Sequence, residues 1–178
     1  MAVVKVDTSE MTEAASILRA GDEVLLSGVV YTARDEAHRR ICAMLRRGED
    51  PPFPLRGSTV YYSGPAPAPP GFPIGSCGPT TSARMDAFTP LLLDLGLKGM
   101  IGKGGRSRAV EEAIRRNGAV YLCAVGGAGA LAARCVKKAE IIAFPELGCE
   151  SIRKLRMEEF PLIVGIDSKG GSLFTTGD

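Results

Sequence analysis

The stretch Cys77-Gly78-Pro79-Thr80-Thr81-Ser82-Ala83-Arg84-Met85-Asp86 combines a tight turn with a run of polar side chains. Gly78 frees the backbone and Pro79 fixes φ at about −65°, which predicts that a helix begins here. Backbone N–H groups at a helix start, two threonine hydroxyls and the guanidinium of Arg84 together favour the binding of an anion. A threonine-capped helix with a surface arginine explains the same local pattern equally well.

The composition around this stretch is that of an ordinary soluble protein. The 178 residues are 45% hydrophobic and 24% charged, which predicts one domain covering residues 1–178. A net charge of +2 and 6% aromatic residues argue against a nucleic-acid-binding surface. The N-terminus lacks the layout of a secretion signal, and the apolar run 118–133 is too short to span a membrane. We therefore expect a cytoplasmic protein.

The cysteines are odd in number and scattered, and there is a single histidine. No two cysteines form a C-x-x-C pair, so a zinc site built from this chain alone is not expected. The cysteines are predicted to be small, buried apolar groups in a reducing compartment. They are Cys42, Cys77, Cys123, Cys135 and Cys149.

Apolar runs and helical patterns alternate loosely along the chain, which predicts the α/β class. The proline-rich segment 64–73 is expected to be an extended, semi-rigid loop, with a linker between domains as the alternative. Residues 150–157 are predicted to form a short helix or turn. Strands are expected at 3–6, 23–32, 58–62, 97–102, 119–125 and 161–167, and helices after Ser9, Arg34, Thr89, Ser107 and Gly126.

Three junctions before predicted helices carry cations. Arg34 follows a strand, Arg84 lies in the opening stretch, and Lys103 and Arg106 follow another strand. Guanidinium groups bind carboxylates in a bidentate manner, so convergence of these junctions would hold a small dicarboxylate. Such a ligand would lie beside Thr80 and Thr81.

A glycine-rich run, 126–130, follows a predicted strand and resembles a dinucleotide-binding turn. Position 132 is alanine, however, and no acidic residue follows a strand at the distance that such a turn requires. Close packing of a helix against a strand is the preferred interpretation, and nucleotide binding is a distant alternative.

Four segments together resemble one known family. They are TARDEAH (32–38), GPTTSARMD (78–86), GKGGRS (102–107) and ELGCE (146–150). In this order they are similar to the β subunit, or C-terminal domain, of iron–sulfur class I fumarases and L-tartrate dehydratases. The resemblance covers nearly the whole chain. It implies a swivelling β/β/α domain and reversible addition of water across an activated carbon–carbon double bond.

The resemblance also implies roles for individual residues. Arg34 and Arg84 match substrate-carboxylate ligands, Lys103 matches a further substrate-binding cation, and Thr80 matches a threonine that handles the proton at carbon. An alcohol is a weak base, so Thr80 would need a carboxylate from another subunit. His38, Asp35, Thr81 and Arg106 are candidates for supporting these groups, and a helix-packing role is the alternative for His38.

The resemblance further implies a [4Fe–4S] cluster that a partner α subunit binds, with no metal held by this chain. The expected partners are that α subunit, a small dicarboxylate and a second β chain, with no nucleic acid or membrane. Many fumarases have asparagine where this chain has Gly105, which leaves fumarate, tartrate or another 2-hydroxy acid open as the substrate. A non-catalytic dicarboxylate-binding module is the alternative of another class.

Overall fold

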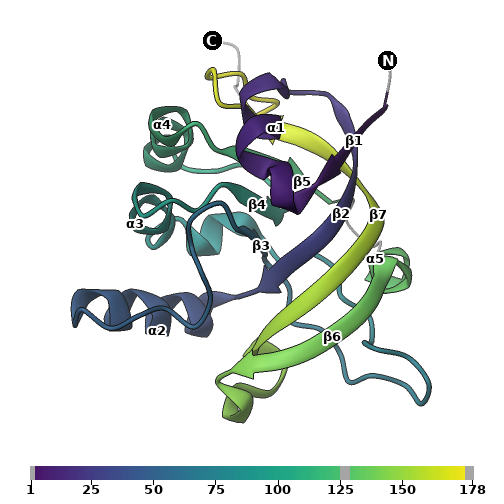
Figure 1. The fold of residues 1–178 in the computed structure, drawn as a ribbon. Coiled ribbons are helices and arrows are strands. Elements are labelled where there is room, and N and C mark those ends of the chain that lie inside the picture. The colour runs from purple at the N-terminus through teal and green to yellow at the C-terminus, as the bar shows by residue number, and fades with distance from the viewer. Residues whose placement is uncertain (1–2, 125–128, 175–178) are drawn as a thin grey trace.

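Strand β2 (Glu23–Thr32) is the centre of the fold, because three other strands pair with it (Figure 1). On one edge β1 pairs with its first half and β3 with its last two residues, both in parallel. On the other edge β7 runs antiparallel. The structure, a computed structural model, describes residues 3–124 and 129–174. The remaining strands are β1 (Val3–Asp7), β3 (Thr59–Tyr61), β4 (Gly99–Gly102), β5 (Val120–Cys123), β6 (Val136–Ala143) and β7 (Ile152–Ile166).

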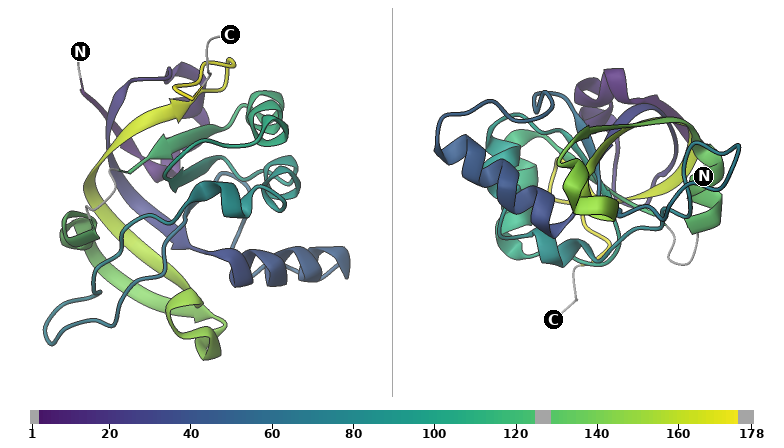
Figure 2. Two further views of the ribbon diagram at one scale, coloured as in Figure 1. Left: turned by 180° about the vertical axis from the view of Figure 1, so that it is seen from behind. Right: turned by 90° about the horizontal axis from the view of Figure 1, so that it is seen from below.

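The sheet closes on itself. Strands β3, β4 and β5 follow one another in parallel, β5 pairs with β7, and β7 returns to β2. The ring β2-β3-β4-β5-β7 is therefore a barrel, and β6 extends it along β7 (Figure 2). Alternate residues of β2 are buried, as a strand with one face toward a core requires. Val24, Leu26 and Val30 belong to one apolar cluster with residues of the facing strands.

Three helices form a second layer outside the barrel (Figure 1). They are α2 (Asp35–Arg46), α3 (Thr89–Asp94) and α4 (Arg108–Asn117), and their apolar faces form a second cluster with β3, β4 and β5. Ser107 caps α4 by accepting a hydrogen bond from the Val110 N–H. Gly118 ends this helix in the left-handed conformation that glycine adopts without strain.

The other helices pack against the barrel core. Helix α1 (Met11–Ile17) and helix α5 (Gly129–Cys135) contribute residues to the apolar cluster of the barrel. The described residues also form three short 3₁₀ helices: η1 (Thr8–Glu10), η2 (Ser82–Met85) and η3 (Pro145–Glu150). The predicted α/β class is confirmed, as is the loop character of segment 64–73, which contains no helix or strand.

One local prediction is wrong, and one strand was missed. Residues 152–157 belong to β7 and not to a short helix or turn, and β6 was not expected. Both strands depend on partners distant in the sequence: β7 pairs with β2 from Glu23 to Tyr31. β6 carries charged residues on exposed positions, so its pattern lacks the alternation that identifies a strand.

The predicted helix start at Pro79 is also wrong, because the first helical residue of that stretch is Ser82. Ser9 was predicted to cap the first helix, but the residue that caps is Asp7. Its side chain accepts a hydrogen bond from the Ser9 N–H at the start of η1. The glycine run 126–128 lies outside the described residues, and the described part of the helix begins at Gly129.

Burial of the cysteines is partly as predicted. Cys42, Cys77 and Cys135 are buried and Cys123 is half-buried, but Cys149 is exposed on η3, which lies at the surface. All five thiols are free. Within the described residues, no helix is both long enough and apolar enough to cross a bilayer.

Candidate active site

The candidate site lies where β2, β3 and β4 end. These strands are parallel neighbours, with Thr32 opposite Tyr61 and Tyr61 opposite Ile101. The residues that follow them therefore reach the same edge of the barrel. Arg34 follows β2 and Lys103 follows β4, so the two predicted cations belong to one edge.

The segment that contains Thr80 is held along this edge by backbone hydrogen bonds. The Thr80 N–H donates to the Tyr62 carbonyl at 2.8 Å, and the Ser63 hydroxyl donates to the Gly78 carbonyl at 3.0 Å. Thr81 forms a parallel bridge with Lys103. Thr80 and Thr81 thus lie between the ends of β3 and β4, with Thr80 half-buried and Thr81 exposed.

Ser82 fixes the position of Lys103. The Lys103 N–H donates to Ser82 Oγ, and the Ser82 N–H donates to the Lys103 carbonyl, both at 3.0 Å. This close approach requires Gly102, because a Cβ there would lie only 1.9 Å from Ser82 Oγ. The Lys103 ammonium is exposed and forms no hydrogen bond or ion pair with the described residues.

Arg84 joins this edge through Asp35. Its Nη2 lies 2.5 Å from Asp35 Oδ2, and Asp35 is the first residue of α2. Arg34, directly before it, extends its side chain over Gly64, where a Cβ would be 2.8 Å from Arg34 Nη1. The predicted residues Arg34, Asp35 and Arg84 therefore meet at the start of α2.

Unsatisfied polar atoms concentrate at this helix start. Four buried side-chain nitrogen or oxygen atoms of the described residues have no hydrogen-bond partner, and three of them are Arg34 Nε, Asp35 Oδ1 and His38 Nε2. A buried polar atom without a partner costs about 1–3 kcal/mol. Such a cluster indicates a place where a ligand or another chain completes the hydrogen bonding.

His38 is completely buried and neutral. Its Nδ1–H donates to the Arg34 carbonyl at 2.8 Å, and its ring lies edge-on to Tyr62 with centroids 5.4 Å apart. Burial, opposed by the hydrogen bond to Arg34, lowers the pKa of His38 to about 4. The imidazole therefore supports the position of Arg34 from inside, which agrees with a packing role.

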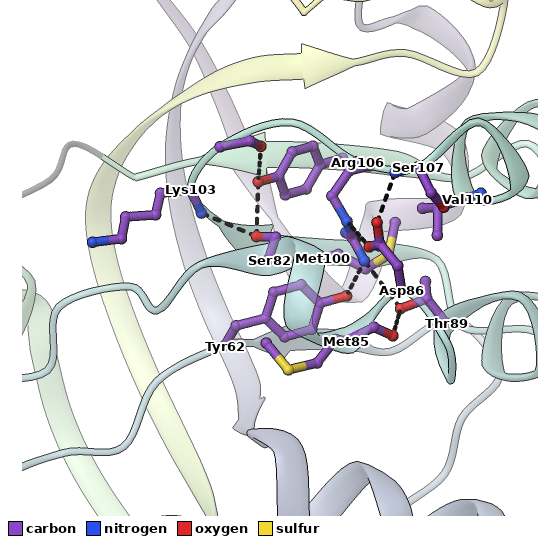
Figure 3. Close-up of polar contacts among 12 residues, drawn as sticks. Tyr62, Ser82, Met85, Asp86, Thr89, Met100, Lys103, Arg106, Ser107 and Val110 are labelled. Carbon is purple, nitrogen blue, oxygen red and sulfur yellow. Dashed lines mark hydrogen bonds and ion pairs between the residues drawn. The ribbon is translucent and has the colours of Figure 1, made fainter.

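Arg106 points into the protein and not toward the edge (Figure 3). Its side chain is fully buried, its Nε donates to Asp86 Oδ1 at 2.7 Å, and its Nη2 donates to Tyr62 and Thr89. Its Cζ lies 5.1 Å from the centroid of the Tyr62 ring. With these partners Arg106 is not available to a ligand. The prediction that Arg106 joins the other cations at the site is therefore wrong.

Asp86 and Tyr121 complete this internal network, and sequence reasoning assigned neither a role. Asp86 Oδ2 accepts from the Ser107 N–H at 2.6 Å, so one carboxylate joins η2 to the start of α4. The Tyr121 hydroxyl lies 2.8 Å from both Ser82 Oγ and the Gly104 carbonyl oxygen. The network holds the two loops that carry Thr80, Arg84 and Lys103.

The described residues offer no group of three His, Cys, Asp or Glu side chains close enough to hold a metal ion. Cys77 precedes the threonines, but burial raises the pKa of its thiol to about 12. Its sulfur is therefore protonated in the metal-free chain. The residues of this chain do not fit an iron–sulfur cluster bound by the described part alone.

Comparison with known proteins gives a consistent family. A family model described as the fumarase C-terminus matches residues 1–177. The chain is 39% identical over 157 residues to fumarate hydratase 2 of Leishmania major, covering 87% of this chain and 28% of that protein. It is 40% identical over 151 residues to the anaerobic class I fumarate hydratase of Escherichia coli, covering 84% of this chain and 28% of that protein.

A relative of similar length has a different name. The chain is 40% identical over 163 residues to the "Putative L(+)-tartrate dehydratase subunit beta" of Methanocaldococcus jannaschii. The match covers 88% of this chain and 84% of that protein. The chain thus spans little more than a quarter of the fumarate hydratases but most of this subunit.

Proposed function

The chain belongs to the fumarase C-terminus family, and we propose that it is the β subunit of a two-subunit iron–sulfur hydro-lyase. In this proposal it binds the substrate carboxylates and carries a proton-transfer threonine for the reversible hydration of fumarate to L-malate. The single observation that supports it most is the arrangement at the ends of β2 and β4. There, Arg34 and Lys103 form no ion pair with any of the described residues, and Thr80 is held at the end of the strand between them.

The cations would bind and orient the substrate. Arg34 and Lys103 are free to bind carboxylate oxygens, and Arg84 keeps donors available beyond its contact with Asp35. As a proton leaves the carbon next to a carboxylate, negative charge develops on that carboxylate. Cations fixed beside it stabilise this charge more than they stabilise the bound substrate, and this difference accelerates the reaction.

Thr80 would handle the proton at carbon. Its backbone is fixed by the hydrogen bond to Tyr62, which places the residue between the two cationic ends. Because an alcohol is a poor base, the proton must pass on to a carboxylate, which we assign to the partner. The partner's [4Fe–4S] cluster would supply the Lewis acid for the substrate hydroxyl.

Tartrate is the second candidate substrate. The tartrate dehydratase subunit is covered over 84% of its length, whereas the fumarate hydratases are much longer single chains. L-Malate and tartrate are both dicarboxylates with a hydroxyl next to a carboxylate, so the same cations suit both. A panel of malate, tartrate and other 2-hydroxy acids on the reconstituted enzyme separates these candidates.

We further propose that residues 1–178 act as one swivelling β/β/α unit in the cytoplasm, that two such chains can pair, and that they work only with the α subunit. The closed barrel and the helix layer support a unit that can move as one body. The test is to mix the purified chain with its cluster-bearing α subunit and to follow malate–fumarate interconversion. Activity that appears only in the mixture is expected, and full activity of this chain alone would refute the proposal.

A further inference from the structure

A polar cavity of about 430 Å³ lies at the opposite end of β3 from the candidate active site. The candidate active site lies beyond the C-terminal end of β3. This cavity lies at the N-terminal end of the same strand, where Gly57, Ser58 and Thr59 line it. None of the residues assigned above to substrate binding lines it. The cavity is therefore a separate feature of the molecule.

The cavity arises from the way in which two strands share one edge of β2. Strand β1 pairs with residues 23–27 and β3 with residues 31–32, which leaves residues 28–30 between them without a partner strand on that edge. Gly28 has a φ of +105°, and a Cβ there would lie 2.3 Å from Thr8 Oγ1. Glycine thus permits the close approach of η1 to β2 that shapes one wall.

Three threonine hydroxyls of the lining have no hydrogen-bond partner among the described residues. Thr59 is completely buried, and its Oγ1 is the fourth of the unsatisfied buried polar atoms. Thr8 and Thr12 also line the cavity, and their hydroxyls form no hydrogen bond. Thr59 Oγ1 faces Gly99 and is closed off from the cavity, whereas the Thr12 hydroxyl is exposed and can donate to a ligand that supplies an acceptor.

Two arginines add positive charge to the same lining. Arg56 and Arg156 are exposed and form no hydrogen bond or close ion pair with the described residues, although the charge of Arg156 helps to lower the pKa of the Asp7 carboxyl. Asp7 also lines the cavity, but its Oδ1 already accepts from the Ser9 N–H and the Ser9 hydroxyl. The lining therefore has a net positive charge and several free donors.

We propose that this cavity binds a phosphate monoester, whose phosphate group contacts Arg56, Arg156 and the exposed Thr12 hydroxyl. A phosphate presents acceptor oxygens in several directions, which suits donors that come from different strands and loops. The volume is many times the roughly 30 Å³ of a water molecule, so an organic body fits beside the phosphate. Tyr31, stacked on Phe53 with centroids 4.3 Å apart, offers that body an apolar wall.

Calorimetric titration of the full chain with glycerol phosphate and with inorganic phosphate, at constant ionic strength, tests the proposal. We expect each of Arg56→Gln and Arg156→Gln to weaken glycerol phosphate binding about tenfold. The double variant Arg46→Gln/Arg115→Gln removes two positive charges from other exposed arginines, twice the charge that each single variant removes, and should bind as the wild type does. Binding that falls equally in this control would overturn the proposal, because only net charge would then matter.

Thr12→Val gives a second, independent test. The substitution removes an exposed hydroxyl at nearly constant volume, so the melting temperature of the free protein should change little. Glycerol phosphate binding should nevertheless weaken about tenfold. Unchanged binding by Thr12→Val would contradict the proposed contact.

Two further titrations identify the ligand class and the location. Lys103→Met should bind glycerol phosphate as the wild type does, and a loss confined to this variant would move the anion to the active site. Malonate, a dicarboxylate, should bind more weakly than glycerol phosphate in a manner independent of Arg56 and Arg156. Tighter malonate binding through these two arginines, or no binding of either phosphate probe, would refute the proposal.

Discussion

Lys103 and Arg106 are three residues apart on one loop and have opposite environments (Figure 3). The Arg106 side chain is fully buried between the rings of Tyr62 and Tyr121 and has a carboxylate, two hydroxyls and a sulfur as partners. The Lys103 ammonium is exposed and has no partner among the described residues. One cation stabilises the loop, and the other is available to a ligand.

The comparison teaches how to separate structural from functional cations. A buried charge is tolerated only when its hydrogen bonds are satisfied within the protein, and then it has nothing left to offer. A cation that the fold holds by its backbone, while its head group stays unpaired, keeps its binding capacity. The backbone of Lys103 is held by Ser82, and Ser82 is held by the same network that surrounds Arg106.

The largest expected effect is on stability. Arg106→Met should leave Asp86 without its buried partner and lower the free energy of unfolding by about 3–5 kcal/mol. Urea unfolding followed by circular dichroism measures this change. Arg108→Met is the matched control, because Arg108 is paired with Glu112 but its side chain is 91% exposed. Equal losses in the two variants would contradict the structural role of Arg106.

The next effect is a pH dependence centred on His38. Its pKa in the folded protein is about 4, below its ordinary value of 6.5, so the unfolded chain binds the extra proton more readily. The stability that the neutral, buried His38 contributes is fully present above pH 6.5 and is lost as the pH falls toward 4. It amounts to about 3 kcal/mol.

His38→Gln keeps an N–H donor and removes this titration. Urea unfolding at a series of pH values should give a shallower loss of stability below pH 6.5 for the variant than for the wild type. Parallel curves for the two proteins would show that His38 is protonated without cost.

Lys103→Met tests the other half of the comparison. In the enzyme reconstituted with the α subunit, the rate of malate–fumarate interconversion should fall about a hundredfold, since a preorganised cation next to the developing charge is lost. The melting temperature should stay within about 1 °C, because no partner within the described residues is left unpaired. Lys154→Met, at another exposed lysine, is the control for activity. If Lys103→Met lowered the melting temperature and left the activity unchanged, Lys103 would be a structural residue and not a substrate-binding one.

The smallest expected effect is at Asp35. The Arg84 and Asp35 side chains are 52% and 35% exposed, so their ion pair contributes at most about 1 kcal/mol to stability. Asp35→Asn should therefore leave unfolding nearly unchanged. Since Asp35 restrains Arg84, the KM for malate should rise by roughly fivefold at similar kcat. A kcat decrease of the size seen for Lys103→Met would instead give Asp35 a direct role in the reaction.

Prediction from sequence succeeded where the signal was local or carried by a specific motif. The β-branched and apolar residues of 23–32 identified β2, and the four motifs identified the family that the match over residues 1–177 confirms. Prediction failed for β6 and for the first half of β7, whose strand conformation depends on pairing with distant residues. It also left Arg106 grouped with Lys103, because two cations on one loop look alike until their surroundings are known.

The sequence by itself determined which chemistry the chain can offer: cations, hydroxyls and a turn whose glycine and proline set the backbone locally. Tertiary structure alone decided which of these groups remain free. Arg106 is buried between Tyr62 and Tyr121 and so cannot bind a ligand. The barrel closes through the pairing of β2 with β7, and the ends of β2, β3 and β4 lie at one edge of it. The physical reason is that desolvation and hydrogen-bond satisfaction depend on neighbours far along the chain, which no local pattern encodes.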